Sequence, residues 1–283
     1  MSYFILTATC PDRIGINAAV SNFLSNRGCN IQDFQQYTDQ ASGTFFLRVA
    51  FSPSAEATDR AVLVDEFLTV ANRFDMRFEL HDSARKARVL MMVSKIGHCM
   101  NDILFRYRAG ILPIEIPVMV SNHITFQQEA QFHDIPFVHL PTTPATKIEQ
   151  EDKLWDLVEE HRIDLVILAR YMQVLSEKSV DRLKGRAINI HHSFLPSFKG
   201  AKPYHQAYDR GVKLIGATAH YVTADLDEGP IIEQEVSRVD HTMNPNTLAA
   251  IGRDVERVVF QRAIKAHIEH RVLLNGTSTV VFP

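Results

Sequence analysis

The stretch VLMMVSKIGHCMNDILFRYR, residues 89–108, decides the fold of most of this chain. Residues 89–93 are all apolar, which is typical of a strand buried on both faces of a parallel sheet. Residues 98–108 then form a candidate helix, and strand and helix patterns go on alternating beyond it. This alternation predicts a mostly parallel sheet with helices on both of its faces.

The elements expected in this region alternate in type along the chain. The predicted strands are 89–93, 116–120, 137–140, 165–168, 187–190 and 214–221. The predicted helices are 98–108, 149–161 and 246–270. The polar, charged segment DSARKAR at 82–88 precedes all of them and indicates a boundary between two domains, 1–83 and 84–283.

The first 80 residues show a different order of patterns. Apolar or alternating segments predict strands at 2–9, 30–37, 44–51 and 73–80. Amphipathic spacing predicts helices at 13–27, with a start near Asp12, and at 61–71. The resulting order βαββαβ is the ferredoxin-like split unit. We therefore expect a small α/β domain ahead of the larger one.

Composition excludes several classes of protein. The chain has 283 residues, 46% of them hydrophobic, which is ordinary for globular domains with a sizeable core. A formal net charge of -3 gives no sign of a nucleic-acid partner, and no apolar run of about 18 residues predicts a membrane span. The N-terminus lacks the pattern of a secretory signal. Three cysteines fit a reducing compartment, so we expect a cytoplasmic protein.

The densest group of polar residues is NIHHSFLPSFKGAKPYHQA, at 189–207. It follows a predicted strand, and in open parallel sheets ligands bind at the carboxyl ends of strands. Asn189 and His191 are two residues apart on extended chain, so their side chains point the same way. A carboxamide and an imidazole therefore face one place at this edge.

A second polar segment, HYVTADLDEGP at 220–230, follows the predicted strand 214–221. It supplies His220 and, after a short turn, Asp227. Asn189 can donate to an oxygen that becomes negative, His191 can move a proton, and Asp227 can hold the imidazolium or accept a proton. Such a trio needs no side-chain nucleophile. The same residues also fit a structural part, in which they only satisfy backbone groups near a turn.

A metal site at the candidate site has little support in the sequence. His192, His205 and His220 are separated by 13 and 15 residues, which matches no standard ligand spacing. His192 fits a structural position better, and we expect no metal. A phosphate-binding turn is not indicated either, since SKIGHCMND at 94–102 holds a single glycine.

The motifs NIH with SFLPSFKG, within 189–200, and HYVTADLDEGPII at 220–232 together resemble the folate-dependent formyltransferase superfamily. That group includes glycinamide ribonucleotide and methionyl-tRNA formyltransferases and formyltetrahydrofolate deformylases. The resemblance implies a Rossmann-like sheet and places the catalytic Asn, His and Asp of the superfamily at Asn189, His191 and Asp227.

Details of the chain resemble the deformylases more than the transferases. These are the segments 191–234, VSKIGHCMNDIL at 93–104 and NGTSTVVF at 275–282. The loop 94–98 also lacks the glycine-containing phosphate loop of the ribonucleotide transferase. The resemblance thus implies hydrolysis of 10-formyltetrahydrofolate to formate and tetrahydrofolate, with no cofactor, which would supply formate for purine synthesis and balance one-carbon folate pools.

The segment LARYMQVLS at 168–176 resembles the folate-binding loop of the superfamily, although the transferase has a basic residue where this chain has Gln173. The resemblance implies a substrate-binding set of Arg170, Tyr171, Met172, Val174, Leu175, His220 and Gly229. Side chains of this loop also fit an ordinary place in the core. Lys147 and Lys199 are candidates to steer the glutamate tail of the folate.

The segment TCPDRIGI at 9–16 looks like an ACT domain, a small amino-acid-sensing module. The resemblance implies an effector such as methionine or glycine, and a homo-oligomer, because ACT domains tend to pair between chains. The implied regulatory site consists of Asp12, Arg13, Gly15 and Ile16, with Asn30 from a facing domain. PDRIG also fits a simple helix cap.

Three alternative functions remain open from the sequence. The chain could be a formyltransferase to an amine, which would depend on an added amine. It could be an amino-acid-binding regulatory protein with a degenerate catalytic domain, although an intact trio argues against that. It could also be a metal hydrolase, which a chelator would inactivate.

Overall fold

The computed structural model describes residues 3–53, 59–196 and 203–283. The chain divides into two compact units. One comprises Met1–Lys86 with Glu269–Leu273 and Val280–Pro283, and the other comprises Ala87–Ile268 with Leu274–Thr279. The first unit thus includes two segments from the end of the chain, which the sequence patterns do not indicate.

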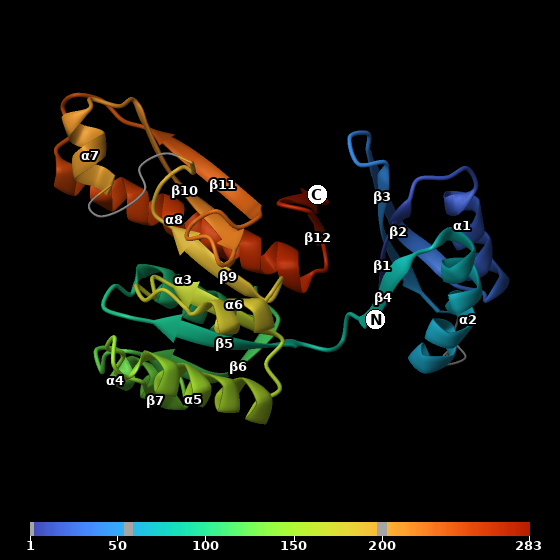
Figure 1. The fold of residues 1–283 in the computed structure, drawn as a ribbon, viewed down its shortest axis with the longest axis horizontal. Coiled ribbons are helices and arrows are strands. Elements are labelled where there is room, and N and C mark those ends of the chain that lie inside the picture. Colours follow the sequence, from blue (N-terminus) through green and yellow to red (C-terminus); the bar gives the residue numbers. More distant parts are fainter. Residues whose placement is uncertain (1–2, 54–58, 197–202) are drawn as a thin grey trace. The chain divides into compact units, whose positions relative to one another are not determined.

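The first unit is an antiparallel sheet of four strands in the order β2-β3-β1-β4, with two helices on one of its faces (Figure 1). Its elements are β1 (Phe4–Pro11), α1 (Ile16–Asn26), β2 (Asn30–Asp39), β3 (Thr44–Ser52), α2 (Arg60–Phe74) and β4 (Arg77–Asp82). Apolar residues of both helices, such as Phe23 and Phe67, meet those of β1 and β3 in one core. The predicted βαββαβ order is confirmed.

Two predicted boundaries in this unit are wrong. Helix α1 begins at Ile16 rather than near Asp12, because Gly15 has a left-handed backbone (φ 97°) just before it. The predicted strand at 73–80 begins only at Arg77, because α2 continues to Phe74. Phe74 is buried in the core, so its contacts favour a further helical turn over the alternation seen in the sequence.

The second unit is a seven-stranded sheet in the order β11-β10-β9-β8-β5-β6-β7. Its strands are β5 (Ala87–Val93), β6 (Ile114–Ser121), β7 (Phe137–His139), β8 (Leu165–Ala169), β9 (Ala187–His191), β10 (Leu214–Tyr221) and β11 (Ile231–Arg238). Strands β5 to β9 are parallel to one another, whereas β10 runs antiparallel to both of its neighbours, β9 and β11. The predicted mostly parallel sheet is confirmed.

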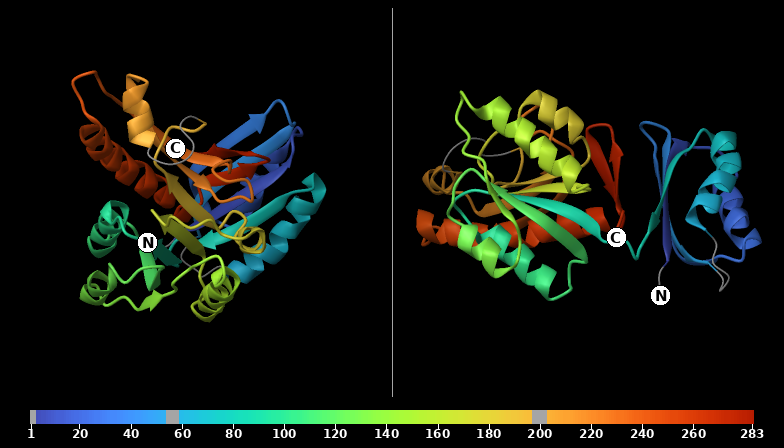
Figure 2. Two further views of the ribbon diagram at one scale, coloured as in Figure 1. Left: turned by 60° about the vertical axis from the view of Figure 1, so that its left-hand side comes forward. Right: turned by 90° about the horizontal axis from the view of Figure 1, so that it is seen from below.

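Helices cover both faces of this sheet, with α5 and α6 on one side and α3 and α8 on the other (Figure 2). The helices are α3 (His98–Arg108), α4 (Gln127–Phe132), α5 (Lys147–Glu160), α6 (Glu177–Arg182), α7 (Pro203–Asp209) and α8 (Pro245–Ile268). A hairpin of β12 (Val272–Asn275) and β13 (Ser278–Val281) follows. Among the helices of the described residues, none has the length and apolar character to cross a bilayer.

The sheet order brings three strand ends together. Strand β5 lies beside β8, with Val93 opposite Ala169, and β8 lies beside β9, with Leu168 opposite Asn189. The residues that follow β5, β8 and β9 therefore share one edge of the sheet. The order of the strands reverses between β5 and β8, and such a switch point is where ligands bind in open α/β sheets.

Candidate active site

Asn189 and His220 lie opposite each other on β9 and β10. The Asn189 Nδ2 is 3.3 Å from the His220 Nε2, and the His220 Nδ1 is 2.9 Å from the carbonyl oxygen of Tyr221. A carbonyl only accepts, so Nδ1 carries the proton and Nε2 of the neutral ring accepts from Asn189. His220 thus orients the carboxamide of Asn189. The second N–H of that carboxamide is left available to donate to another oxygen.

His191 is held between two groups. Its Nδ1 is 3.2 Å from the Asp227 Oδ2, and its Nε2 is 2.8 Å from the Ser193 hydroxyl. His191 is 4% exposed, and the Asp227 side chain is 14% exposed. The hydrogen bond from His191 holds the pKa of Asp227 well below its usual range. Asp227 is therefore a carboxylate at neutral pH.

The backbone of the 222–230 loop aims Asp227 at the two histidines. Asp227 has a left-handed backbone (φ 57°), a conformation that Asp tolerates better than most residues. Gly229 lies against β10, where a Cβ would stand 1.7 Å from the Tyr221 carbonyl oxygen. Because no side chain fits there, the loop closes tightly, and the Tyr221 amide donates to the Pro230 carbonyl oxygen at 2.9 Å. This tight turn places the carboxylate.

The segment after β9 is fixed by Thr218, which is fully buried. Its hydroxyl donates to the Ser193 carbonyl oxygen at 2.9 Å and accepts from the Leu195 amide at 3.1 Å. Ser193, the hydroxyl partner of His191, is therefore held at a defined place. The sequence signal for both residues was weak, since single Ser and Thr residues are common in strands and turns.

The predicted trio of Asn189, His191 and Asp227 thus lies at one edge of the sheet, where it offers an N–H donor, an imidazole and a carboxylate. The formyl transferase family matches residues 87–264 of this chain. A formyltetrahydrofolate deformylase from Corynebacterium sp. (strain P-1) is 48% identical over 277 residues, which are 98% of this chain and 97% of that one. The crystal structure of a formyltetrahydrofolate deformylase from Burkholderia mallei superposes with a TM-score of 0.96 at 52% identity, covering all of both chains.

The chain belongs to the formyltetrahydrofolate deformylase family. The predicted hydrolase class, the ACT-like first unit and the formyltransferase fold of the second are thereby confirmed. A glycinamide ribonucleotide transformylase from Symbiobacterium toebii is less similar, with 28% identity and a TM-score of 0.65. It covers 70% of this chain, whereas the chain covers 95% of it.

In this deformylase-family chain, the loop after β8 divides its side chains between core and surface. Tyr171 and Leu175 are buried in the hydrophobic core, and burial raises the pKa of the Tyr171 hydroxyl. Met172 and Val174 are 57% and 55% exposed. Arg170 has a left-handed backbone (φ 61°), and its side chain is nine-tenths buried. The exposed side chains and the irregular backbone are the parts of this loop open to a ligand.

Glu151 of α5, which the sequence did not single out, anchors the end of the same loop. Its carboxylate accepts from the Ser176 amide at 2.8 Å, from the Ser176 hydroxyl and from the Ser179 hydroxyl at 2.7 Å. Lys147, predicted to steer a folate tail, is half-buried at the start of α5. Lys199 lies outside the described residues.

One group of potential metal ligands occurs in the described part of the chain, and it is His98, Cys99 and Glu256 rather than the three histidines considered from the sequence. Their ligand atoms lie within 4.8 Å of one another. Burial raises the pKa of the Cys99 thiol, which disfavours the thiolate that a metal requires. The guanidinium of Arg170 beside Glu256 also opposes a cation. These residues do not fit a metal centre.

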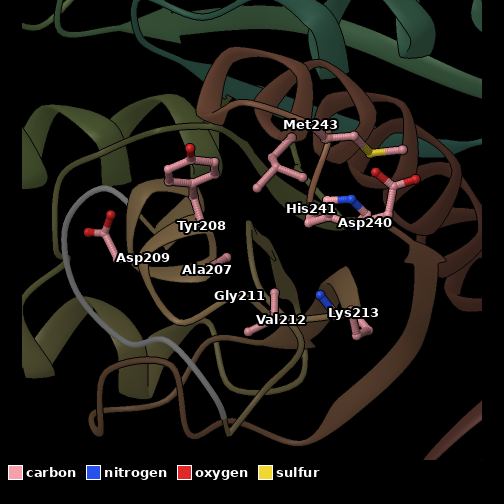
Figure 3. A pocket seen from close by; sticks show the side chains of 10 residues that line it. Ala207, Tyr208, Asp209, Gly211, Val212, Lys213, Asp240, His241 and Met243 are labelled. Carbon is pink, nitrogen blue, oxygen red and sulfur yellow. The ribbon is translucent and has the colours of Figure 1, made fainter.

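A separate hollow of about 430 Å³ lies between α7, the start of β10 and the segment before α8 (Figure 3). Figure 3 shows Lys213, Asp240 and His241 near one another at its wall, with Met243 and Val212 alongside. Its lining contains none of the predicted site residues. The polar groups of the hollow carry both signs of charge, which indicates no particular ligand.

In the first unit, four of the five predicted regulatory residues share the loop before α1. Asp12 is exposed, Arg13 pairs with Asp75 at 2.8 Å, and Ile16 is buried in the core. Gly15 supplies the left-handed turn between them. Asn30 begins β2 opposite Ser52, at the far end of the sheet, roughly 25 Å away at strand spacing. Within one chain, Asn30 therefore does not meet this loop.

Proposed function

We propose that this chain hydrolyses 10-formyltetrahydrofolate to formate and tetrahydrofolate. The observation that carries the proposal is the assembly of Asn189, His191 and Asp227 at one sheet edge. Support comes from full-length relatives named as deformylases, whereas the transformylase covers only part of the chain.

We assign each residue of the trio a separate role in the reaction. Asp227 orients a water and takes its proton as the water oxygen attacks the formyl carbon. The free N–H of Asn189 and the imidazolium of His191 stabilise the resulting oxyanion. The bond from carbon to N10 then breaks as N10 takes a proton from His191. The proton on Asp227 returns to His191 across their 3.2 Å contact.

The deciding experiment is formate release from 10-formyltetrahydrofolate in a buffer without any amine acceptor. The proposal predicts formate and tetrahydrofolate in equal amounts. Turnover that requires an added amine would instead make the chain a formyltransferase. Activity lost with a chelator and restored by a metal would favour a metal hydrolase.

We propose that the pterin ring lies against the loop after β8 and pairs with its backbone. Met172 and Val174 are exposed there and can contact the ring. Tyr171 and Leu175 would act from the core by holding the loop in shape. The remaining members of the predicted substrate set, Arg170, His220 and Gly229, would act at the edge nearest the trio.

We propose further that the ACT-like unit binds an amino acid such as methionine or glycine at the loop of Asp12, Arg13, Gly15 and Ile16. Since Asn30 lies far from that loop in one chain, a second copy would have to supply it, and this favours a homo-oligomer. Equilibrium dialysis with each amino acid tests the site. Binding that Asn30→Ala leaves intact would contradict the shared site.

A cytoplasmic location suits this function. All three cysteines, Cys10, Cys29 and Cys99, are buried and unpaired. Thiols without disulfide partners are typical of reducing compartments. In that compartment the enzyme would supply formate for purine synthesis and balance the one-carbon folate pools.

A further inference from the structure

The switch point between β5 and β8 is filled by polar side chains rather than open. His98 begins α3 after β5, Arg170 follows β8, and Glu256 reaches the same place from α8. In an open α/β sheet this crevice is the usual place for a ligand. The proposed mechanism uses none of the contacts that these residues make with one another.

Glu256 is the centre of this network. It is 1% exposed, and its Oε2 accepts from the His98 Nε2 at 2.7 Å. Its Oε1 accepts from the Tyr204 hydroxyl at 2.7 Å, and the Arg170 Nε lies 3.5 Å from Oε2. Burial alone would raise the pKa of Glu256, but the bond from His98 and the charge of Arg170 outweigh it and lower the pKa. Both carboxylate oxygens are thus occupied by donors from the protein.

Tyr204 reaches Glu256 across a gap in the surface of α8. A Cβ on Gly252 would stand 2.0 Å from the Tyr204 hydroxyl, so only glycine leaves room for the ring. Gly252 and Glu256 are one helical turn apart and therefore share a face. A glycine inside a helix costs about 1 kcal/mol relative to alanine, and the close approach of Tyr204 gives a physical reason for it here.

One ring, that of His192, lies between the network and His191. The ring of His192 lies 5.0 Å from the ring of His191 on one side and 6.4 Å from that of Tyr204 on the other, between centroids. Burial, with Arg170 and His191 nearby, lowers the pKa of His192 to about 4. His192 is therefore a neutral spacer between the network and the trio.

A buried carboxylate next to a reacting carbonyl is the natural partner for the ammonium of an amine substrate, because it can hold the group and take its proton. Here Tyr204 and His98 use that carboxylate, and the Tyr204 ring occupies space beside it. We propose that the network of Tyr204, Glu256 and His98 fills the place of an amine acceptor and so restricts the acceptor of the formyl group to water. This inference rests on the proposed hydrolysis.

Removing the Tyr204 ring should let an amine reach the formyl group. In that reaction the amine nitrogen attacks the formyl carbon, the bond to N10 breaks, N10 gains a proton and the amine loses one. The products are a formamide and tetrahydrofolate. The probe is glycinamide, a small amine partly unprotonated near neutral pH, and the readout is the ratio of N-formylglycinamide to formate by mass spectrometry.

We expect wild-type protein to give only formate at every glycinamide concentration. Tyr204→Ala should raise the ratio of formylated amine to formate by about tenfold or more, in proportion to the amine. Tyr204→Phe keeps the ring but frees the Glu256 Oε1, and it should raise the ratio of formylated amine to formate by less. This variant also tests the proposal if Tyr204→Ala fails to fold. The matched control is Tyr208→Ala, an exposed tyrosine one turn along α7, which should behave as wild type.

The outcomes separate this inference from the proposed function. Wild-type protein that releases no formate contradicts the hydrolysis itself. Hydrolysis by wild-type and both Tyr204 variants with an unchanged product ratio overturns only the role of the network. Formylated amine from the wild-type protein would also overturn that role.

Discussion

Replacing Gly229 by alanine tests whether the tight turn places the carboxylate of Asp227 for its proposed part in catalysis. The new Cβ would stand 1.7 Å from the Tyr221 carbonyl oxygen, 2.9 Å from its carbon and 3.1 Å from the His220 Nδ1. An ordinary contact between carbon and oxygen needs more than about 3 Å, so the loop must move by roughly 1.5 Å. The obstacle is backbone within the sheet, which cannot turn aside as a side chain can.

This shift would act two residues from Asp227, whose carboxylate is 3.2 Å from the His191 Nδ1. Misplacing a catalytic group by about 1 Å can cost on the order of 100-fold in rate. We therefore expect Gly229→Ala to lower kcat by about 100-fold or more. Overpacking should also lower the free energy of unfolding by about 1–3 kcal/mol.

The assay is steady-state formate release, with thermal unfolding measured on the same samples. Gly211→Ala is the matched control, because its Cβ would meet no atom within 4 Å, although its backbone is left-handed (φ 61°). It should lose about 1–2 kcal/mol of stability and keep its kcat. A Gly229→Ala protein with wild-type kcat would refute the reasoning.

Three other predictions follow from the same contacts. Asn189→Ala should lower kcat by about 100- to 1000-fold and leave KM nearly unchanged in steady-state assays, since it removes the proposed oxyanion donor; a change in KM alone would contradict that role. Glu151→Gln should lower the free energy of unfolding in urea by about 2 kcal/mol and raise KM, because it weakens the bonds that hold Ser176. The control Glu149→Gln, at an exposed position, should change neither the unfolding free energy nor KM by much. The pKa of Asp227 is lowered from 3.8, so its charge stabilises the fold above that pH, and this stabilisation is lost as the pH falls below it. The difference in unfolding free energy between wild type and Asp227→Asn should therefore narrow between about pH 5 and pH 3, and a constant difference would count against the paired carboxylate.

Local sequence rules were sufficient to predict that Asn189, His191 and Asp227 lie at one edge of the sheet. Asn189 and His191 share a face because they are two apart on a strand, and both lie in or at the end of β9. Asp227 follows β10 by a turn that Gly229 makes possible. The parallel sheet was also predictable from local sequence, because the apolar runs of β5 and β8 are continuous, as in strands buried on both faces.

Contacts between distant segments were not predictable in this way. The bond between Tyr204 and Glu256 joins residues 52 apart, and that between Glu151 and Ser176 joins residues 25 apart. The sequence did hold one indication for Glu256. It is a glutamate on the apolar face of a helix, one turn after Gly252, and a buried carboxylate needs a hydrogen-bond or charged partner. The short helices α4 and α6, with six residues each, hold too few turns to show a period.

The central claim is that Asp227 acts in the chemical step rather than in folate binding. The most direct measurement is single-turnover formate release by wild-type protein and Asp227→Asn, with binding of 10-formyltetrahydrofolate to each determined by calorimetry. We predict that the variant binds the folate with nearly wild-type affinity and releases formate about 100- to 10,000-fold more slowly. A folded Asp227→Asn protein that releases formate at the wild-type rate would contradict the account.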